Sequence, residues 1–306
     1  MISIIVCTRN RQGSLARLLE DLREARFADD AELLVVDNGS AGGPGPMLTG
    51  LTRVGDLPAR VLEEPRLGQS FARNRGIDAA RGGWLLFLDD DVRLAPDWAP
   101  RLTGELERLG AVAGGGRVDP VWPAGLPRWV STDPDRVERI AFVQFSLGDR
   151  SRLLNPDDAP PIGCNMGFRR EVFASLGGFA TALGHAGNRL IGGEDAEVFA
   201  RLRAAGMPAG YVADAVVRHP VDPERLTLGY LIRRRYWEGI GASGQPRVAG
   251  RALAGVPGAV WRAFGRHAAS ATGAALRGDW PAAAHHLGGA AHRVGFAVGS
   301  WRGPPS

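Results

Sequence analysis

The sequence predicts an α/β protein with a mostly parallel sheet that carries helices on both faces. Two observations lead to this prediction. Short β-branched apolar segments alternate with helix-periodic segments through the first 120 residues. Polar and acidic residues also follow directly on several of the apolar segments, as at the strand ends of open sheets. Alternation of this kind is typical of strands joined by crossover helices, which favour parallel pairing.

The expected elements follow one another along the chain. The β-branched run from Ile2 to Thr8 predicts a buried strand, and leucines at helical spacing follow it. Strands are expected at residues 2–8, 33–36, 60–63, 84–88, 111–118, 163–168 and 211–217. Helices are expected at residues 14–26, 70–80, 97–109 and 194–203.

Two regions depart from the alternation. Residues 119–161 are rich in proline, contain Trp122 and Trp129 and lack periodicity, so an irregular insertion over one face of the sheet is expected. Three further helices are expected after the last strand, at residues 223–240, 256–276 and 280–299. We therefore predict a main domain over residues 1–240 and a helical C-terminal extension over residues 241–306.

Composition and charge narrow the classes of function. The 306 residues are 44% hydrophobic and 23% charged, which is ordinary for a globular protein. All 37 basic residues are arginine, so Schiff-base and P-loop lysines are excluded. Residues 1–219 hold 26 arginines and 29 acids, whereas residues 220–306 hold 11 arginines and four acids. The basic C-terminal segment either meets an anionic partner or forms solvated helices.

The two cysteines, Cys7 and Cys164, lie far apart in apolar stretches and form neither a disulfide framework nor a metal motif. The apolar N-terminus has no basic segment before it, and no apolar run reaches the roughly 18 residues of a membrane span. We expect a cytoplasmic protein, with peripheral contact to the inner face of a membrane as an open alternative.

Polar residues at the ends of four expected strands are the candidates for a site, because ligands of open parallel sheets bind beyond these ends. They are Thr8, Arg9, Asn10, Asp37, Asn38, Asp89, Asp90, Asp91 and His219. Four strand ends that all carry polar groups are more than turn formation requires.

The aspartate run is the most informative of these. Asp89 and Asp91 lie on the same side of an extended backbone, where two like charges favour a bound cation. Carboxylates suit Mg²⁺ or Mn²⁺, and an imidazole from His219 would favour manganese over calcium. The alternatives are a turn with solvated aspartates and an ordinary packed histidine.

Glu194 and Asp195 open an expected helix behind a glycine-rich loop, residues 184–193. Acids at this position are favoured by the helix dipole alone. The functional alternative is a general base, which needs a carboxylate beside an acceptor hydroxyl.

These residues, in this order, resemble the family 2 glycosyltransferases over about residues 1–240. Each segment alone is weak, and the six together are specific. The matching segments are 4–10, 35–40, Gly68 with 72–77, 86–91, 164–168 and 192–195.

The resemblance implies a GT-A (Rossmann-like) fold, a divalent metal ion (Mn²⁺ or Mg²⁺) and a nucleotide-sugar donor. It implies that Asp195 is the catalytic base. Glu194 is expected to be the second catalytic residue, which orients the loop or binds an acceptor hydroxyl. The resemblance assigns the metal to Asp91 and to His219. It also assigns donor binding to Thr8, Asp37, Arg73 and Asp89, and we expect the strand-end residues Arg9, Asn10, Asn38 and Asp90 to bind the donor as well.

The expected activity is inverting transfer of one sugar to a hydroxyl of a glycan, lipid-linked or other acceptor. Asp37 favours uridine or thymidine diphosphate sugars over guanosine diphosphate sugars, because its carboxylate can accept a pyrimidine imide N–H. A nucleotidyltransferase of similar fold and a non-catalytic relative that binds sugars or nucleotides are the alternatives. No nucleic-acid partner is expected. The C-terminal helices, residues 241–306, contact a membrane, the main domain or a second subunit.

Overall fold

The computed structural model describes residues 1–306 apart from 28–29, 134–140, 185–191, 244–251, 254–255 and 303–306. The chain divides into two compact units. Unit 1 comprises residues 1–121, 143–181 and 194–220, and unit 2 comprises residues 122–142, 182–193 and 221–306. The division into a main domain over residues 1–240 and an extension over residues 241–306 stays a prediction.

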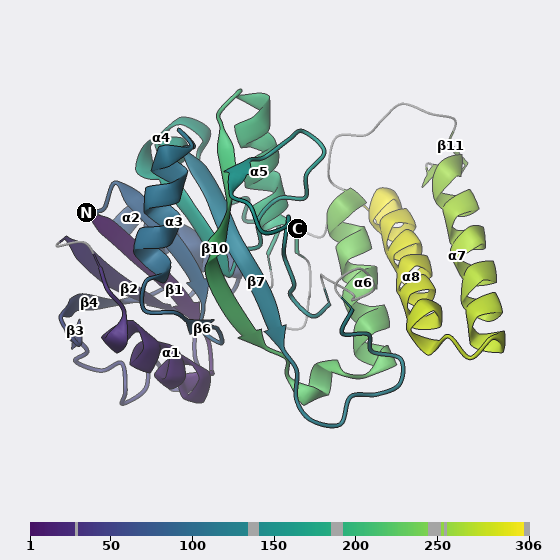
Figure 1. Cartoon of the computed structure of the whole chain (residues 1–306), viewed down its shortest axis with the longest axis horizontal. Helices are drawn as coiled ribbons and strands as arrows, with labels where there is room; N and C mark the ends of the chain where they lie inside the picture. Colours follow the sequence, from purple (N-terminus) through teal and green to yellow (C-terminus); the bar gives the residue numbers. More distant parts are fainter. Residues whose placement is uncertain (28–29, 134–140, 185–191, 244–251, 254–255, 303–306) are drawn as a thin grey trace. The chain divides into compact units, whose positions relative to one another are not determined.

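The strands of unit 1 form one large sheet (Figure 1). Their bounds are β1 (Ile2–Thr8), β2 (Ala31–Asp37), β3 (Arg53–Val54), β4 (Leu57–Glu63), β5 (Trp84–Asp89), β6 (Arg93–Leu94), β7 (Ala113–Val121), β8 (Arg152–Leu153), β9 (Asn165–Arg169) and β10 (Ala209–Pro220). Within the described part of the chain, the strand order is β3-β4-β2-β1-β5-β9-β7-β10-β6, and β8 pairs with β10.

The pairing confirms a mostly parallel central sheet. The strands β4, β2, β1 and β5 run parallel to one another, and so do β7 and β10. Between these two groups lies β9, which is antiparallel to both of its neighbours. The register aligns Thr8 with Asp37 and Cys7 with Asp89, so the polar strand ends gather at one edge of the sheet.

Helices cover both faces of this sheet, as predicted. The helices of unit 1 are α1 (Gln12–Glu24), α2 (Gln69–Ala79), α3 (Trp98–Arg108), α4 (Arg170–Leu176) and α5 (Glu194–Ala204). Because side chains alternate along a strand, Ile4 and Val6 of β1 pack with α1 and α3, while Ile5 packs with α2, α4 and α5. The central strands are therefore buried on both faces.

The last strand of unit 1 contains an irregularity that one side chain fills. The parallel register of β10 and β7 shifts between Val212 and Val217. The amide nitrogen of the fully buried Asn165 donates hydrogen bonds to the carbonyls of Arg117 (2.9 Å) and Ala215 (2.8 Å). Its amide oxygen accepts from the indole of Trp98 at 2.8 Å. Asn165 thus satisfies backbone groups that the interrupted ladder leaves without a partner strand.

The expected insertion, residues 119–161, is divided between the two units. In its described part, β8 is a short strand, and an isolated bridge joins Val118 to Phe145. In unit 2, Trp122 and Trp129 pack around Phe142. The irregular character predicted for this region agrees with these short elements.

Unit 2 is mainly helical. It contains a short 3₁₀ turn (Pro223–Arg225), α6 (Leu228–Ser243), β11 (Ala252–Leu253), β12 (Val256–Pro257), α7 (Gly258–Leu276) and α8 (Trp280–Arg302). The sequence placed the first helix at residue 223, whereas α6 starts at Leu228, because Pro223 and Asp222 form the separate turn. No helix in the described residues is long and apolar enough to cross a membrane.

Glycines allow close packing of α6 on α8. A Cβ atom at Gly239 would lie 2.0 Å from the carbonyl oxygen of His292. A Cβ atom at Gly295 would lie 1.9 Å from the carbonyl oxygen of Tyr236. Any larger residue at either position would force the two helices apart.

Candidate active site

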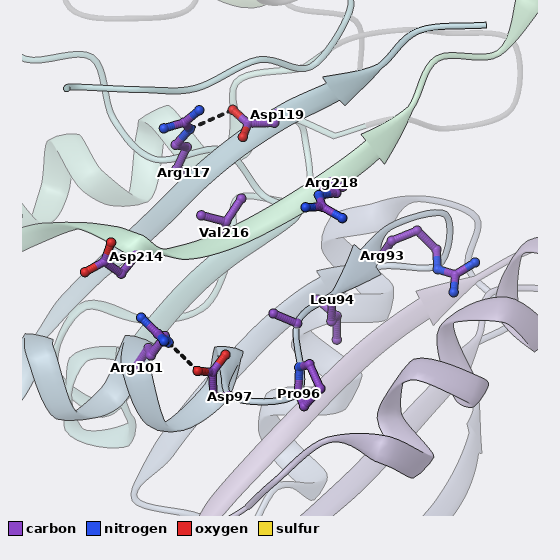
Figure 2. Close-up of a pocket in the computed structure, with 11 residues that line it drawn as sticks. Arg93, Leu94, Pro96, Asp97, Arg101, Arg117, Asp119, Asp214, Val216 and Arg218 are labelled. Carbon is purple, nitrogen blue, oxygen red and sulfur yellow. Dashed lines mark hydrogen bonds and ion pairs between the residues drawn. The ribbon is translucent and has the colours of Figure 1, made fainter. Parts of the chain in front are cut away.

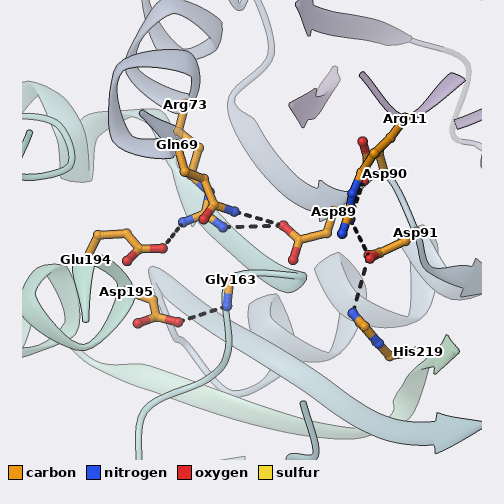
Figure 3. A network of polar contacts seen from close by, with 10 residues as sticks. All are labelled: Arg11, Gln69, Arg73, Asp89, Asp90, Asp91, Gly163, Glu194, Asp195 and His219. Atoms are coloured by element: carbon orange, nitrogen blue, oxygen red, sulfur yellow. Dashed lines mark hydrogen bonds and ion pairs between the residues drawn. The ribbon is translucent and has the colours of Figure 1, made fainter. Parts of the chain in front are cut away.

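The site of unit 1 is built at the strand ends that the sequence singled out (Figure 3). The end of β5 supplies Asp89, and the turn after it supplies Asp90 and Asp91. His219 comes from the end of β10, and Glu194 begins α5. The topology brings these elements together because β1, β5, β9, β7 and β10 are neighbours in the sheet.

Two carboxylates and one imidazole converge in this site. One ligand atom from each of Asp89, Asp91 and His219 lies within 4.8 Å of the others. The imidazole Nε2 of His219 is 3.3 Å from Asp91 Oδ1, and the side chain of His219 is only 2% exposed. Among the described residues this is the single group of three or more such ligands. The donor set of two carboxylates and an imidazole suits a divalent cation such as Mn²⁺.

Arg11 faces the same acids and was not predicted. Its guanidinium is 2.6 Å from Asp91 Oδ2 and 3.2 Å from Asp90 Oδ1, and its side chain is 44% exposed. Burial opposes the charge, but Asp91 and Asp90 raise the pKa of Arg11 above its ordinary value. Arg11 therefore neutralises part of the charge of the aspartate run while remaining accessible to solvent.

Asp90 points away from the metal-ligand group. Its carboxylate accepts a hydrogen bond from the Thr8 hydroxyl at 2.6 Å, and the residue is 4% exposed. Burial, followed by the charge of Asp91, raises the pKa of Asp90 to about 6. Thr8 and Asp90 thus form a buried link between the ends of β1 and β5.

The remaining strand-end residues hold the backbone around the site. Asp37 accepts hydrogen bonds from the backbone and hydroxyl of Ser40. The Asn38 side-chain amide donates to the carbonyls of Glu64 and Arg66 and accepts from the N–H of Gly68. These hydrogen bonds hold the segment that leads into α2. Both Asp37 and Asn38 are buried.

Asn10 and Arg9 shape the turn after β1. Asn10 adopts a left-handed conformation (φ 56°), which asparagine tolerates, and its side-chain oxygen accepts from the N–H of Ala41 at 2.8 Å. The exposed Arg9 donates to the carbonyl of Gly39 at 3.3 Å. The geometry places Asn10 and Arg9 beside the turn that follows β2, and Arg11 at the acids.

Arg73 of α2 bridges the two acidic parts of the site. Its guanidinium lies 2.8 Å from Glu194 Oε1 and 3.5 Å from Asp89 Oδ1, and the side chain is 3% exposed. Gln69, one turn earlier, donates to the same oxygen of Asp89 at 3.1 Å. Burial opposes the charge, but Glu194 and Asp89 raise the pKa of Arg73 above its ordinary value. This buried cation offsets the charge of Asp89 and of the α5 acids together.

Asp195 points away from Glu194, toward the backbone of Gly163. The Gly163 N–H donates to Asp195 Oδ2 at 3.1 Å, and the Ala196 N–H donates to Oδ1 at 2.7 Å. Desolvation, followed by the neighbouring Glu194 charge, raises the pKa of Asp195 to about 6. A carboxylate with this pKa is ionised at neutral pH and can accept a proton.

Gly163 was not predicted either, and it contacts both sides of the site. A Cβ atom at this position would lie 2.3 Å from Nη2 of Arg73. Its backbone N–H holds Asp195, as described above. Only glycine combines the two contacts, because any side chain would displace the guanidinium. Most of the glycine-rich loop expected before α5 lies outside the described residues.

A second hollow in unit 1 lies apart from these residues (Figure 2). It has a volume of about 550 Å³, and no predicted site residue lines it. Several of its lining residues pair with each other or with a neighbouring acid, as Arg101 does with Asp97 and Arg117 with Asp119. These two pairs offset four of the charges in the lining.

Fold and site together define an α/β enzyme with a candidate divalent-cation site and a separate carboxylate of raised pKa. The model of the family described as Glycosyl transferase family 2 matches residues 3–177, which is more than half of the chain. The chain therefore belongs to glycosyl transferase family 2 and is a glycosyltransferase with the GT-A fold. This result sets aside the nucleotidyltransferase and the non-catalytic relative.

Curated relatives agree with this assignment. The chain is 26% identical over 243 residues to a glucosyl-dolichyl phosphate glucuronosyltransferase of Haloferax volcanii, covering 78% of this chain and 75% of the relative. It is 28% identical over 241 residues to the succinoglycan biosynthesis protein ExoM of Rhizobium meliloti, covering 78% and 72%.

A solved structure supports the fold. The mannosyltransferase PcManGT from Pyrobaculum calidifontis, in complex with GDP-Man and Mn²⁺, superposes with a TM-score of 0.62 at 22% identity. The match covers 96% of this chain and 86% of that protein.

Proposed function

We propose that the chain catalyses the inverting, metal-dependent transfer of a single sugar from a nucleotide-sugar donor to a hydroxyl group of an acceptor. The observation that carries the proposal is the convergence of Asp89, Asp91 and His219 beside the separate carboxylate Asp195. The first three side chains suit a divalent cation that binds the diphosphate of the donor. Asp195 suits a general base that accepts the proton of the acceptor hydroxyl. The buried Arg73 contacts both Asp89 and Glu194, and Glu194 is the neighbour of Asp195 in the chain.

The metal is held, in this proposal, by Asp91 and His219, with Asp89 as a third ligand or a contact to the donor. These side chains fit Mn²⁺ or Mg²⁺ because hard oxygen ligands dominate, and the imidazole favours manganese. When bound, such an ion acts as a Lewis acid that neutralises charge on the leaving diphosphate. Arg11 supplies positive charge to the same region from the protein itself.

The donor is proposed to bind along the ends of β1, β2 and β5 and the start of α2. The residues assigned to it are Thr8, Arg9, Asn10, Asp37, Asn38, Arg73, Asp89 and Asp90. Asp37 favours a uridine or thymidine diphosphate sugar, since its carboxylate can accept an imide N–H. The similar PcManGT is in complex with GDP-Man, which keeps guanosine diphosphate sugars as the second candidate.

Asp195 is proposed to act as the general base. Its carboxylate takes the proton of the acceptor hydroxyl while the hydroxyl oxygen bonds to the anomeric carbon and the bond to the diphosphate breaks. Attack from the face opposite the leaving group inverts the anomeric configuration in one step. Glu194 does not share this role, because its carboxylate is held by Arg73 at 2.8 Å. The hydrogen bond from Gly163 keeps Asp195 oriented before the acceptor arrives.

The acceptor is proposed to be a hydroxyl of a glycan or a lipid-linked intermediate. The two curated relatives named above support this class, one by its glucosyl-dolichyl phosphate acceptor and the other by its role in succinoglycan biosynthesis.

A ligand panel tests the donor and metal parts of the proposal. We would measure thermal stability with UDP, dTDP and GDP, each with Mn²⁺ and with a chelator. A ligand that binds only the folded state raises the melting temperature, so the cognate nucleotide should do so in Mn²⁺ and lose most of the effect in chelator. Stabilisation by none of the three nucleotides in Mn²⁺ would contradict the proposed donor class.

A further inference from the structure

We propose that one face of α8 docks the protein on an anionic lipid surface. This face carries Trp280, Leu287, Val294 and Trp301, which we call the α8 stripe. Their exposed fractions are 44%, 39%, 38% and 71%, although all four side chains are apolar or aromatic. Exposed apolar residues that gather on one face mark an interaction surface more often than isolated ones do.

The spacing of the α8 stripe places its members in a single row. Successive members are seven residues apart, and seven residues fall only about 20° short of two full helical turns. At 1.5 Å per residue the row extends about 30 Å along the helix. Contacts with α6 and α7 occupy other sides of α8 within unit 2.

Charge in these helices favours an anionic partner. Between Gly258 and Arg302 the chain contains five arginines and one acid, Asp279. Three of the arginines, at positions 262, 266 and 277, are exposed. Basic residues close to a lipid surface gain free energy from anionic headgroups, and tryptophan is enriched at the membrane–water interface. Tryptophan begins and ends the α8 stripe, as expected for a helix that lies along such an interface.

A second copy of the chain fits this face less well. A coiled-coil seam needs two rows of large apolar side chains, three or four residues apart. The positions three and four residues after Trp280, Leu287 and Val294, which would supply the second row, are alanines at 283, 284, 290, 291 and 297 and a valine at 298. Ala283, Ala284 and Ala297 are already buried within the chain. Pairing two copies here would also bring like charges together.

Vesicle flotation tests the proposal. The full-length protein would be mixed at low salt with vesicles of phosphatidylcholine that contain about one third phosphatidylglycerol, since surface attraction is strongest there. Binding to these vesicles should exceed binding to pure phosphatidylcholine and should fall at high salt. L287E and V294E should each lower the partition coefficient by about tenfold or more, because a carboxylate opposes both insertion and attraction to the anionic surface. The matched control is L153E on β8, where the leucine is equally exposed and lies outside unit 2.

Three results would overturn the proposal. These are no binding of the wild type to the anionic vesicles, equal binding to neutral vesicles at all salt concentrations, and unchanged binding of both α8 variants. Sedimentation velocity of the same proteins tests whether a second copy of the chain binds to the α8 stripe instead. A wild-type dimer that L287E converts to a monomer would assign the α8 stripe to self-association instead. Circular dichroism verifies folding of each variant, and the use of two separate positions guards against misfolding of one.

Discussion

Two acidic segments of this chain look alike in sequence and behave differently in the structure. The run Asp89 to Asp91 follows a strand, and two of its carboxylates converge with His219 on one small volume. The pair Glu194 and Asp195 begins a helix, and its carboxylates diverge, one to Arg73 and the other to the N–H of Gly163.

The backbone explains the difference. The strand β5 ends at Asp89 and the chain turns at Asp90 and Asp91, which leaves Asp89 and Asp91 facing one small volume with His219 while Asp90 faces Thr8. At a helix start, neighbouring residues are turned by about 100°, so adjacent acids address different partners. The carboxylates therefore converge on one volume after the strand and address separate partners at the helix start.

Loss of a converging carboxylate should have the largest effect. We expect Asp91→Ala to abolish sugar transfer, because the remaining ligands hold the metal too weakly to neutralise the leaving diphosphate. Nucleotide affinity in Mn²⁺ should fall as well, which isothermal titration calorimetry would measure. The control is Asp56→Ala, a fully exposed acid far from the site in sequence. Full activity of the wild-type enzyme in excess chelator would refute the metal role.

Loss of the diverging base should slow the reaction and leave the donor bound. We expect Asp195→Asn to lower kcat by about 10²- to 10⁴-fold, the range for removal of a general base. The donor dissociation constant should change little, since a base acts in the transition state. Glu194→Gln is the matched comparison. A nearly normal rate for Asp195→Asn, together with an inactive Glu194→Gln, would reverse the two assignments.

The cation between the two segments should matter for stability. Arg73→Leu leaves Glu194 and Asp89 without their shared partner, and breaking a buried pair in this way costs about 3 kcal/mol or more of unfolding free energy. Urea denaturation would measure this loss. Arg108→Leu removes an exposed partner of Glu105 and should leave the urea midpoint unchanged. Equal midpoints for the two variants would show that Arg73 does not link the segments energetically.

The pH dependence of kcat/KM should show the smallest of these effects. It also shows which of the two acidic segments titrates. With the pKa of Asp195 raised to about 6, the base is protonated below that pH, so kcat/KM should fall about tenfold per pH unit in acid. The pKa of Asp90 is also raised to about 6, in the other segment. The residual activity of Asp195→Asn distinguishes them. If the acidic limb persists in this variant, it arises from the aspartate run.

The sequence predicted the central sheet and most side chains of the site, because both depend on local patterns. Buried apolar runs defined the main strands, and polar strand ends must meet at one edge of a parallel sheet. Asp89, Asp91 and His219 were accordingly expected together, and the structure brings them together. Which of the predicted residues contact donor, metal or acceptor stays a prediction.

The features that could not be predicted from the sequence depend on contacts between segments that are distant in the chain. Arg11 was missed because its position at Asp91 follows from the left-handed Asn10 before it, which no periodicity predicts. Gly163 was missed because its contribution is a backbone N–H and the absence of a side chain. His267 and His286 are 19 residues apart, and only the pairing of α7 with α8 brings their ring nitrogens within 3.3 Å.

The register shift in β10 decides which face of the sheet the residues after it point to. Val212 and Val217 pair with residues of β7 that are two positions apart, although they are themselves five apart, an odd number. The shift therefore changes the phase of the strand, and His219 lies in the site because of it. In an uninterrupted strand, Val212 and His219, which are seven residues apart, would point to opposite faces of the sheet. The amide of Asn165, far away in the chain, holds the carbonyl of Ala215 inside the interrupted segment and so helps to keep the phase that brings the imidazole of His219 to Asp91.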